Sequence, residues 1–462
     1  MESPYSPLRQ RLDLVLTSSG VFASVVSNSM LLLAAPKLVD SFHVSYQDLQ
    51  WRSLLFWTAF GASMPLFGRL TERWAAKRQL LCALSIFCAA VVVATATTSW
   101  WLFLLGGLLQ GVADGMAQSA QTVIIKHRFS KDRTGWAFGW QAGVLALASL
   151  VGPVAGGTLL EYMSWRALLW CFLGIGLIAA VCVAFILPAM AMHDTKSQNP
   201  LPTWSALGLT VVLGGAQALV LVRADLRWSL GALVALGLVT FLAAERALPD
   251  RSRYIPPLLK TNRFLLWTSL RGLLIYFPIN AIGVFFPVYL EVVGGWSTLK
   301  TGGALLFDAA ITTVLAGPCG RFADINPRAA IRTGFALMAC GALAFSAVGS
   351  SLPGIIAAVA IIDIGACTAL PAQSRVALSA SPHDETGVYM ALFQGVQFVS
   401  IGASGVVFSP LIQGSNLAEF SGAGFDALCV VAVVLFAAGG LLTFGRDRAV
   451  PGRTPQQSSS HA

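Results

Sequence analysis

Long apolar runs separated by short polar loops constrain this chain more than any other feature of its sequence. A helix needs about 20 predominantly apolar residues to cross a bilayer. Because lipid offers the backbone no hydrogen-bond partner, each such run is predicted to be a helix. Fourteen runs qualify, or twelve if 204–246 is one re-entrant hairpin: 13–36, 51–67, 79–99, 101–125, 135–160, 166–190, 204–222, 228–246, 264–290, 299–320, 330–350, 353–377, 386–412 and 424–444.

The composition supports an all-α integral membrane protein. Of 462 residues, 56% are hydrophobic and only 11% are charged, whereas soluble domains carry about 25% charged residues. The eight cysteines all fall inside the apolar runs without metal-ligand spacing, so neither a disulfide framework nor a metal site is expected. No cofactor is expected either.

Lysine and arginine residues predict the orientation. All but seven of the thirty lie on one side of the predicted membrane if the N-terminus is inside. Basic residues mark cytoplasmic loops, so both termini are predicted to be cytoplasmic in a multi-pass protein of the cell inner (plasma) membrane. The same distribution explains the net charge of +9 by contact with the lipid bilayer, and nucleic-acid binding is not required. Six basic residues fall on the outer side and one, Arg271, lies within a helix; the outer ones are Lys37, Arg52, Arg166, Arg223, Arg227 and Lys300.

An internal echo suggests two related halves. Gly68-Arg69-Leu70-Thr71-Glu72-Arg73 follows the second run, and Gly320-Arg321-Phe322-Ala323-Asp324 follows the tenth. Similar loops at matching places in two halves are typical of transporters. The predicted organisation is a cytoplasmic segment (1–12), a six-helix bundle (13–190), a linker with two extra helices (191–263), a second six-helix bundle (264–444) and a disordered tail (445–462).

A proline among glycines interrupts the fifth run. Residues 151–157 read Val-Gly-Pro-Val-Ala-Gly-Gly, which includes Gly152, Pro153, Gly156 and Gly157. Proline kinks a helix, and small residues let another helix approach closely. The stretch predicts a bent helix that packs tightly against run 299–320. A small-residue packing face without further function is the alternative.

Four ionisable residues are predicted to lie at bilayer depth, away from the ends of the runs: Asp114, Arg271, Asp308 and Asp363. Each costs at least about 2.5–3.5 kcal/mol at bilayer depth, which favours a functional role. Snorkelling to the interface is the alternative for Arg271, and a hydrogen-bonded carboxyl between helices is the alternative for Asp308.

Asp114 shares one helical face with three glutamines, at positions 110, 118 and 121. A face with one Asp and three Gln is not expected to contact lipid. It is predicted to line a water-filled cavity in preference to a polar helix contact. The other residues expected to shape the substrate cavity are Gln110, Gln118, Gln121, Ser27, Asn28, Gln394 and Gln397.

These motifs resemble those of the major facilitator superfamily, and more narrowly of its fourteen-span drug:proton antiporters. Loop 68–78 resembles the superfamily's loop 2–3 motif, with Glu72 in place of Asp. Residues 152–157 resemble the antiporter motif of the fifth helix. Two further positions depart from the family pattern: Ser27 replaces an Asp of the first helix, and Gly107 replaces an Arg of the fourth.

The resemblance implies two six-helix bundles around a central cavity, plus two extra helices. It places Asp114, Arg271 and Asp363 on cavity-lining helices. It also implies a cytoplasmic gating motif made of Gly68, Arg69, Glu72, Arg73 and Arg78.

The predicted function is export of amphipathic drugs or metabolites by proton antiport and alternating access, by a monomer. Asp114 and Asp363, with Asp308 and Arg271, are the candidates for coupling the proton to a small-molecule substrate. A narrow-specificity metabolite carrier, exporter or importer, is the alternative. A membrane-embedded enzyme or sensor is disfavoured because the chain carries no HExxH, GxSxG or P-loop motif.

The gating motif generates one prediction. Glu72→Ala is expected to impair transport and to leave membrane insertion intact, because the latch acts on a conformational step. Efflux assays on membranes matched for protein content measure both effects. Normal transport by this variant would remove the latch hypothesis.

Overall fold

The computed structural model describes residues 7–44, 46–71, 73–130, 133–187, 200–221, 226–255, 263–296, 298–348, 352–380, 386–412 and 422–443. Within these residues all regular structure is helical. The helices are α1 (Pro7–Leu33), α2 (Ala35–Phe42), α3 (Tyr46–Leu70), α4 (Ala76–Ala96), α5 (Trp100–Arg128), α6 (Thr134–Tyr162), α7 (Trp165–Ile186), α8 (Thr203–Leu221), α9 (Arg227–Ala247), the short η3 (Asp250–Ser252), α11 (Arg263–Val292), α12 (Thr298–Ile325), α13 (Pro327–Val348), α14 (Leu352–Ala380), α15 (Thr386–Ile412) and α16 (Gly422–Leu441).

Each predicted run coincides with one helix, except the first, which is divided between two. Its helix begins earlier than predicted, at Pro7, and a turn at Ala34 divides it into α1 and α2. Judged by length and hydropathy, seven helices of the described residues qualify as spans, or eight if α12, bent by 41° between Leu315 and Gly317, is one span. The total of fourteen spans therefore stays a prediction.

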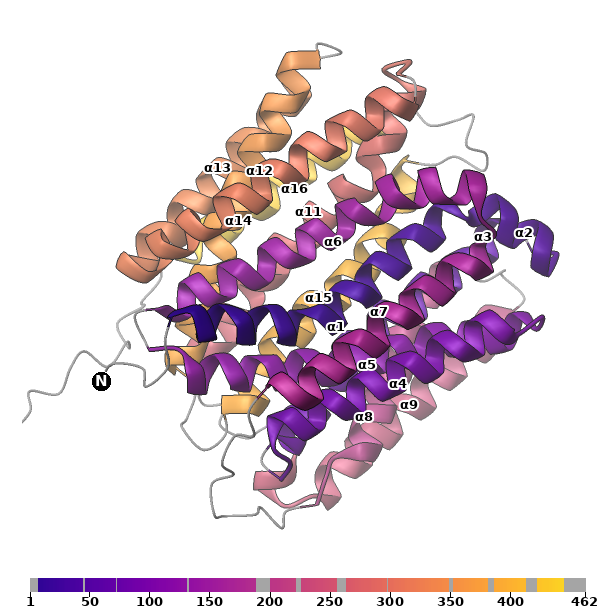
Figure 1. The fold of residues 1–462 in the computed structure, drawn as a ribbon. Coiled ribbons are helices and arrows are strands. Elements are labelled where there is room, and N and C mark those ends of the chain that lie inside the picture. Colours follow the sequence, from indigo (N-terminus) through magenta and orange to yellow (C-terminus); the bar gives the residue numbers. More distant parts are fainter. Residues whose placement is uncertain are drawn as a thin grey trace, which may run out of the picture.

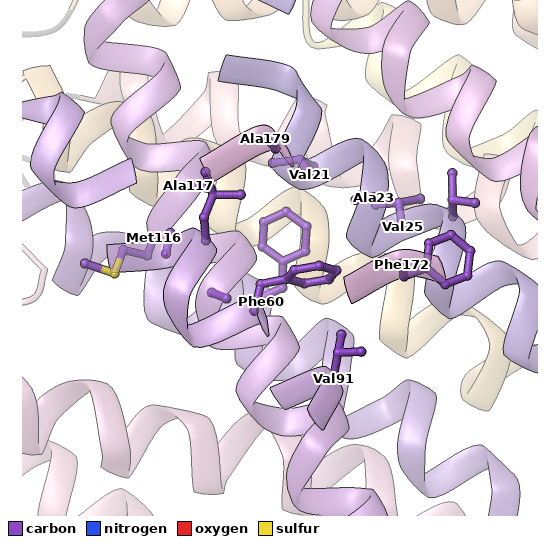
Figure 2. Packing of buried hydrophobic residues seen from close by; sticks show 14 of the residues in the cluster. Val21, Ala23, Val25, Phe60, Val91, Met116, Ala117, Phe172 and Ala179 are labelled. Atoms are coloured by element: carbon purple, nitrogen blue, oxygen red, sulfur yellow. The ribbon is translucent and has the colours of Figure 1, made fainter. Parts of the chain in front are cut away.

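Helices α1 and α3–α7 pack around one apolar core. Among the closest contacts in this bundle are those of α5 with α3 and α4, and of α4 with α7. Figure 2 shows part of this core, with Phe60 of α3, Val91 of α4 and Phe172 of α7 among its side chains. All three are buried. Burying apolar surface in this way holds α1 and α3–α7 together as the first bundle.

Helices α11–α16 pack around a second apolar core. Aromatic rings fill its outer part, where Phe345 of α13 meets Tyr289 of α11 at 5.5 Å and Phe425 of α16 at 5.1 Å between ring centroids. In Figure 1 the helices run in broadly one direction, with α13 on one flank of the molecule and α8 and α9 on the opposite flank. The two cores thus lie in two bundles side by side.

The two bundles meet along α3 and α15 and along α6 and α12. Two glycine pairs, Gly61 with Gly395 and Gly68 with Gly387, let α3 and α15 approach at backbone distance, and we call these pairs the glycine seam. A Cβ atom at Gly61 would lie 2.6 Å from the Gly395 carbonyl, and one at Gly68 would lie 2.6 Å from the Gly387 carbonyl. Beside the seam, the rings of Phe60 and Phe398 stack with centroids 4.0 Å apart.

Helices α8 and α9 form a hairpin that packs on α3 and α15 through α8. The chain after α9 returns to α3, where the buried Tyr254 hydroxyl donates to the Ala62 carbonyl at 2.6 Å. The Glu245 carboxylate accepts hydrogen bonds from the Tyr254 and Ile255 N–H groups at 2.8 and 3.1 Å. Burial, and then the nearby Glu245 charge, raise the pKa of the Tyr254 phenol, so Tyr254 stays a donor at neutral pH. These bonds anchor the hairpin to the first bundle.

The glycine seam generates a prediction about stability. Gly395→Leu is expected to lower the apparent melting temperature in detergent, because overpacking a tight contact costs about 1–3 kcal/mol. Gly283→Leu is the matched control, since a Cβ there meets nothing within 4 Å. Equal melting temperatures for the two variants, measured by fluorescence-detected size exclusion after heating, would show that the seam is not close-packed.

Candidate transport site

Polar side chains connect α1 and α5 along most of their length. Because the two helices are antiparallel, residue numbers fall on α1 as they rise on α5. The Gln110 amide donates to the Ser27 hydroxyl at 3.3 Å, and the Gln121 amide donates to the Ser18 hydroxyl at 2.7 Å. At the end predicted to be cytoplasmic, Arg128 pairs with Asp13 at 3.5 Å. We call these contacts, together with the layer of Asp114 between them, the polar ladder.

Neighbouring helices extend the polar ladder sideways. Gln141 of α6 donates to the Gln121 side-chain carbonyl at 2.9 Å. Thr122 of α5 donates to the Gln394 side-chain carbonyl at 3.0 Å. Because Gln394 lies on α15, this last bond joins the first bundle to the second. The ladder is therefore part of the interface that must change if the bundles move relative to each other.

Arg52 is a member of this site that the sequence analysis missed. The loop count placed it on the outer side of the membrane, but α3 begins at Tyr46, so Arg52 lies inside the helix and is only 4% exposed. Its guanidinium donates to the Gln110 side-chain carbonyl at 2.5 Å and lies 5.0 Å from the Phe103 ring centroid. Gly107 leaves room for it, since a Cβ there would lie 2.9 Å from Arg52 Cγ. One signal in the sequence pointed to Arg52: Gly107 stands where the family pattern has an Arg, and its lack of a side chain leaves the space that Arg52 fills.

Asp114 occupies the middle of the polar ladder. It is 2% exposed, and Ser24 of α1 faces its carboxylate. Gln110, Gln118 and Gln121 are also buried, so the predicted polar face of α5 turns toward the protein interior. In this conformation the described partners of that face are side chains of α1, α3 and α6. The water-filled cavity stays a prediction.

In the second bundle, Arg271 and Gln397 lie at the contact of α11 with α15. Arg271 is 1% exposed and donates to the Thr268 hydroxyl at 3.1 Å, so it does not snorkel to the surface in this conformation. The Gln397 amide packs on the backbone of Gly272, the residue after Arg271. A Cβ atom at Gly272 would lie 2.8 Å from Gln397 Nε2. Asp363 is half-buried on α14. Asp114 and Asp363 therefore belong to different bundles.

Several predicted site residues lie outside the described part of the chain. Glu72 is the one residue of the gating motif among them. For the others the helix is described but the side chain is not: Asn28 on α1, Asp308 on α12, and Pro153, Gly156 and Gly157 on α6. Gly152 is described and buried. The predicted pairing of the fifth and tenth runs is confirmed by the packing of α6 on α12, but the predicted bend at Pro153 is not tested.

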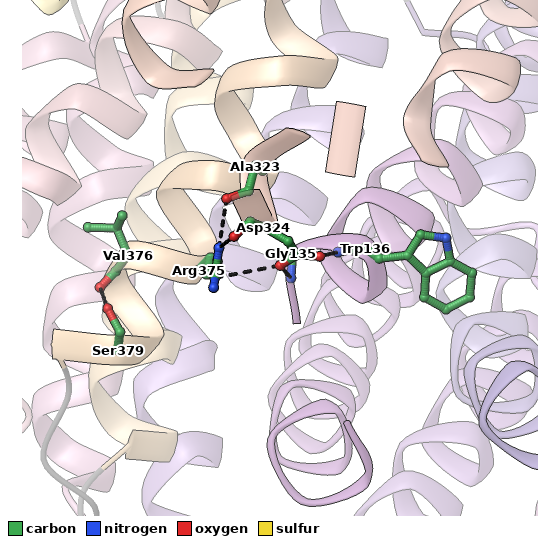
Figure 3. Close-up of polar contacts among 7 residues, drawn as sticks. All are labelled: Gly135, Trp136, Ala323, Asp324, Arg375, Val376 and Ser379. Atoms are coloured by element: carbon green, nitrogen blue, oxygen red, sulfur yellow. Dashed lines mark hydrogen bonds and ion pairs between the residues drawn. The ribbon is translucent and has the colours of Figure 1, made fainter. Parts of the chain in front are cut away.

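A carboxylate of the second bundle holds the start of α6. The first N–H groups of a helix lack partners within the helix, and Arg133 at the N-cap of α6 makes no side-chain hydrogen bond there. Asp324 of α12 accepts from the Gly135 and Trp136 N–H groups at 2.8 and 3.0 Å (Figure 3). Asp324 thus caps a helix of the opposite bundle, where the positive end of the helix dipole favours its charge.

Arg375 of α14 completes this contact from the second bundle. It pairs with the Asp324 carboxylate at 3.5 Å and donates to the Ala323 carbonyl at 2.9 Å and to the Asp324 carbonyl (Figure 3). We call Asp324, Arg375 and the capped N-terminus of α6 the interbundle cap. It closes α6 against α12 at the end predicted to be cytoplasmic. The sequence echo identified the segment Gly320–Asp324, which forms the end of α12, without assigning Asp324 a role.

The described members of the gating motif also lie at the predicted cytoplasmic end. Gly68 belongs to the glycine seam. Arg69 is buried and donates to the Arg253 carbonyl of the linker at 2.8 Å. Arg78 stacks over the Trp74 ring at 4.7 Å, and Arg73 is half-buried. These contacts place the motif where α3, α15 and the linker meet.

Comparisons with known proteins agree with this architecture. The chain is 23% identical over 314 residues to the riboflavin transporter RibZ of Clostridioides difficile (strain 630), covering 67% of each chain. It is 25% identical to the tetracenomycin C resistance and export protein of Streptomyces glaucescens, over 66% of this chain and 57% of that one. Its fold is similar to that of the human organic anion transporter MFSD10 (TETRAN), with a TM-score of 0.71, 16% identity, and coverage of 95% of this chain and 100% of that one.

A sequence model of the Major Facilitator Superfamily matches residues 17–405, which include most of the first bundle, the hairpin, and the second bundle as far as α15. Members of this family are transporters and not enzymes. The two helical bundles, the polar interior and this match lead to one conclusion: the chain is a multi-pass membrane transporter of the Major Facilitator Superfamily.

Proposed function

We propose that this protein exports amphipathic small molecules across the cytoplasmic membrane by proton antiport with alternating access. The observation that carries the proposal is the polar ladder, which places a buried carboxylate, Asp114, between two helices of the first bundle. A carboxylate at this depth is costly and is typical of proton relays. Thr122 and Gln394 connect the ladder to the second bundle, so a change at Asp114 is felt at the contact between bundles.

The interbundle contacts support the alternating-access part of the proposal. Transporters of this type rock one bundle against the other around a fixed site. The interbundle cap and the Gly68–Gly387 pair of the glycine seam lie at the end predicted to be cytoplasmic. This conformation is therefore the one with the cytoplasmic end closed. Opening that end requires Asp324 to release the N-terminus of α6.

Two carboxylates share the coupling role in this proposal. Asp114 and Asp363 lie in different bundles, so loading one with a proton and the other with substrate links occupancy to bundle movement. Arg271, buried in α11, supports the second bundle's share of the site. The proposal includes the predicted division of the fourteen spans into two six-helix bundles and a linker with two extra helices, with both termini in the cytoplasm and the protein as a monomer.

A second candidate function is a carrier with narrow specificity for one metabolite. The similarity to a protein named as a riboflavin transporter favours it, whereas the similarity to a resistance and export protein favours drug or metabolite export. The same fold serves both functions. Substrate competition in one assay separates them.

The antiport proposal predicts gradient-driven uptake by inverted membrane vesicles. Ethidium and riboflavin serve as fluorescent probes of the two candidate functions. We expect an acid-inside gradient to drive probe uptake, and Asp114→Asn and Asp363→Asn each to reduce the gradient-driven rate at least about tenfold, the factor that a loss of about 1.4 kcal/mol produces. Asp426→Asn is the matched control, because Asp426 is exposed at the start of α16. Uptake that ignores the gradient in the parent and in both variants would contradict proton antiport.

The interbundle cap generates a separate prediction about hydrogen exchange. In Asp324→Ala, the Gly135 and Trp136 amides lose their acceptor, and charge-assisted hydrogen bonds contribute about 1.5–3 kcal/mol. We therefore expect the start of α6 to exchange at least about tenfold faster, measured by mass spectrometry in detergent. Asp250→Ala, which removes only the exposed pair with Arg253, is the control. Unchanged exchange at the start of α6 would show that Asp324 does not hold it.

A further inference from the structure

Helix α3 has an internal weak point at Pro65. A proline has no N–H group to donate to the carbonyl four residues earlier, so the Gly61 carbonyl loses its donor within the helix. That carbonyl faces α15 in the glycine seam. The part of the helix beyond the proline, residues 66–70, carries Gly68 of the seam and Arg69 of the gating motif. We call residues 66–70 the inner segment of α3.

The linker after α9 bonds to α3 on both sides of this proline. Before the proline, the Tyr254 hydroxyl donates to the Ala62 carbonyl at 2.6 Å. After the proline, the Arg69 guanidinium donates to the Arg253 carbonyl at 2.8 Å. Because Arg253 and Tyr254 are neighbours in the chain, one short piece of the linker spans the point where α3 lacks an internal hydrogen bond.

The piece of linker that makes these bonds is itself held by α9. Glu245, near the end of α9, accepts hydrogen bonds from the Tyr254 and Ile255 N–H groups at 2.8 and 3.1 Å. Tyr254 is 1% exposed, and its ring meets the Phe241 ring of α9 edge-on, with 6.2 Å between the centroids. We call Glu245 together with residues 253–255 the linker turn. Because α9 fixes its position, the linker turn can act on α3 as a support.

The linker turn also lies beside the contact between the bundles. Leu66 of the inner segment and Leu392 of α15 both pack against the apolar cluster that contains Tyr254. The inner segment meets α15 at Gly68, where the two backbones are in contact. Sharp bends in helices occur most often at proline. A support across Pro65 therefore keeps the inner segment aligned with α15.

We propose that the linker turn bridges Pro65 and positions the inner segment of α3, and with it Arg69, for closure of the cytoplasmic end. Tyr254 and Glu245 are then positioning residues of the transport cycle, although neither belongs to the polar ladder. The extra hairpin consequently takes part in gating in addition to packing on the first bundle. The gating role rests on the proposed alternating access, whereas the support across Pro65 does not.

Hydrogen exchange of the full chain in detergent, read by mass spectrometry, tests the support. Tyr254→Phe keeps the ring and removes only the hydroxyl, so we expect the inner segment to exchange about two- to tenfold faster, the effect of one net hydrogen bond. Pro65→Ala restores the N–H group that the Gly61 carbonyl lacks, so adding Tyr254→Phe to Pro65→Ala is expected to speed exchange less. Tyr162→Phe, exposed at the end of α6, is the matched control. Unchanged exchange in Tyr254→Phe, or an equal increase with and without Pro65, refutes the support.

Glu245 provides a second test that includes a conservative variant. Glu245→Ala removes the acceptor that holds the linker turn, so the inner segment of α3 is expected to exchange faster, as in Tyr254→Phe. Glu245→Gln keeps a side-chain carbonyl that accepts from a backbone N–H group, and is expected to retain more of the protection than Glu245→Ala. Equal exchange of the inner segment in the parent and in Glu245→Ala would show that α9 does not support α3 in this way.

Uptake by inverted vesicles at varied probe concentration, with ethidium or riboflavin, tests the gating role. The cytoplasmic end faces the medium there, and apparent affinity rises with the fraction of molecules that is competent to bind. Loosening the inner segment raises that fraction, so Tyr254→Phe is expected to lower the half-saturating probe concentration. A loss of maximal rate alone would show that Tyr254 only anchors the hairpin, which refutes the gating role. Uptake by the parent that ignores the gradient contradicts the antiport proposal instead, and leaves the exchange result as the test of the support.

Discussion

The need to satisfy polar groups inside a helical membrane protein shapes this molecule more than any other interaction. An unpaired buried polar group costs about 1–3 kcal/mol, yet α5 carries three glutamines and an aspartate along one face. The first bundle compensates for most of that cost by placing Ser27, Ser18 and Gln141 opposite them. Asp114 lies between these contacts, is 2% exposed and faces Ser24 of α1. A carboxylate at this depth is costly, which is why the proposed proton coupling is assigned to it.

The contacts between the bundles add a mechanical counterpart to this chemistry. Glycine pairs bring α3 and α15 to backbone contact, and Asp324 caps α6 from the opposite bundle. The glycine seam and the interbundle cap stabilise the contact when the helices meet and contribute nothing once the helices separate. They therefore favour two discrete arrangements of the bundles over a continuous range. The bond from Thr122 to Gln394 spans the same interface from within the ladder. Chemistry at α5 and closure at the interface are therefore linked through a short series of contacts.

Much of the fold is predictable from the sequence because hydrophobic length is a simple requirement, and each of the apolar runs coincides with a helix. Predicting which polar residues of α5 face the protein interior needed only helical periodicity, and all four are buried; the water-filled cavity that they were expected to line stays a prediction. Arg52 was missed because the charge count assigned it to the outer side, although it lies inside the run 51–67; α3 begins at Tyr46, so Arg52 is well within the helix. The role of Asp324 was missed because capping in trans depends on which helix lies opposite, and no local pattern encodes that. The partners of Gln110 and Gln121 were likewise beyond reach, since they come from helices distant in the chain.

The central claim is that this closed conformation is one of two between which the bundles rock. Distance measurement between spin labels at the predicted cytoplasmic end tests it most directly, with labels at Arg78→Cys on α4 and Ile325→Cys on α12, both exposed positions, in a chain whose eight native cysteines are replaced. We expect a short distance with this end closed and a second, longer population whose share changes with pH. A single distance that stays the same across pH and transported probes would contradict rocking of the bundles.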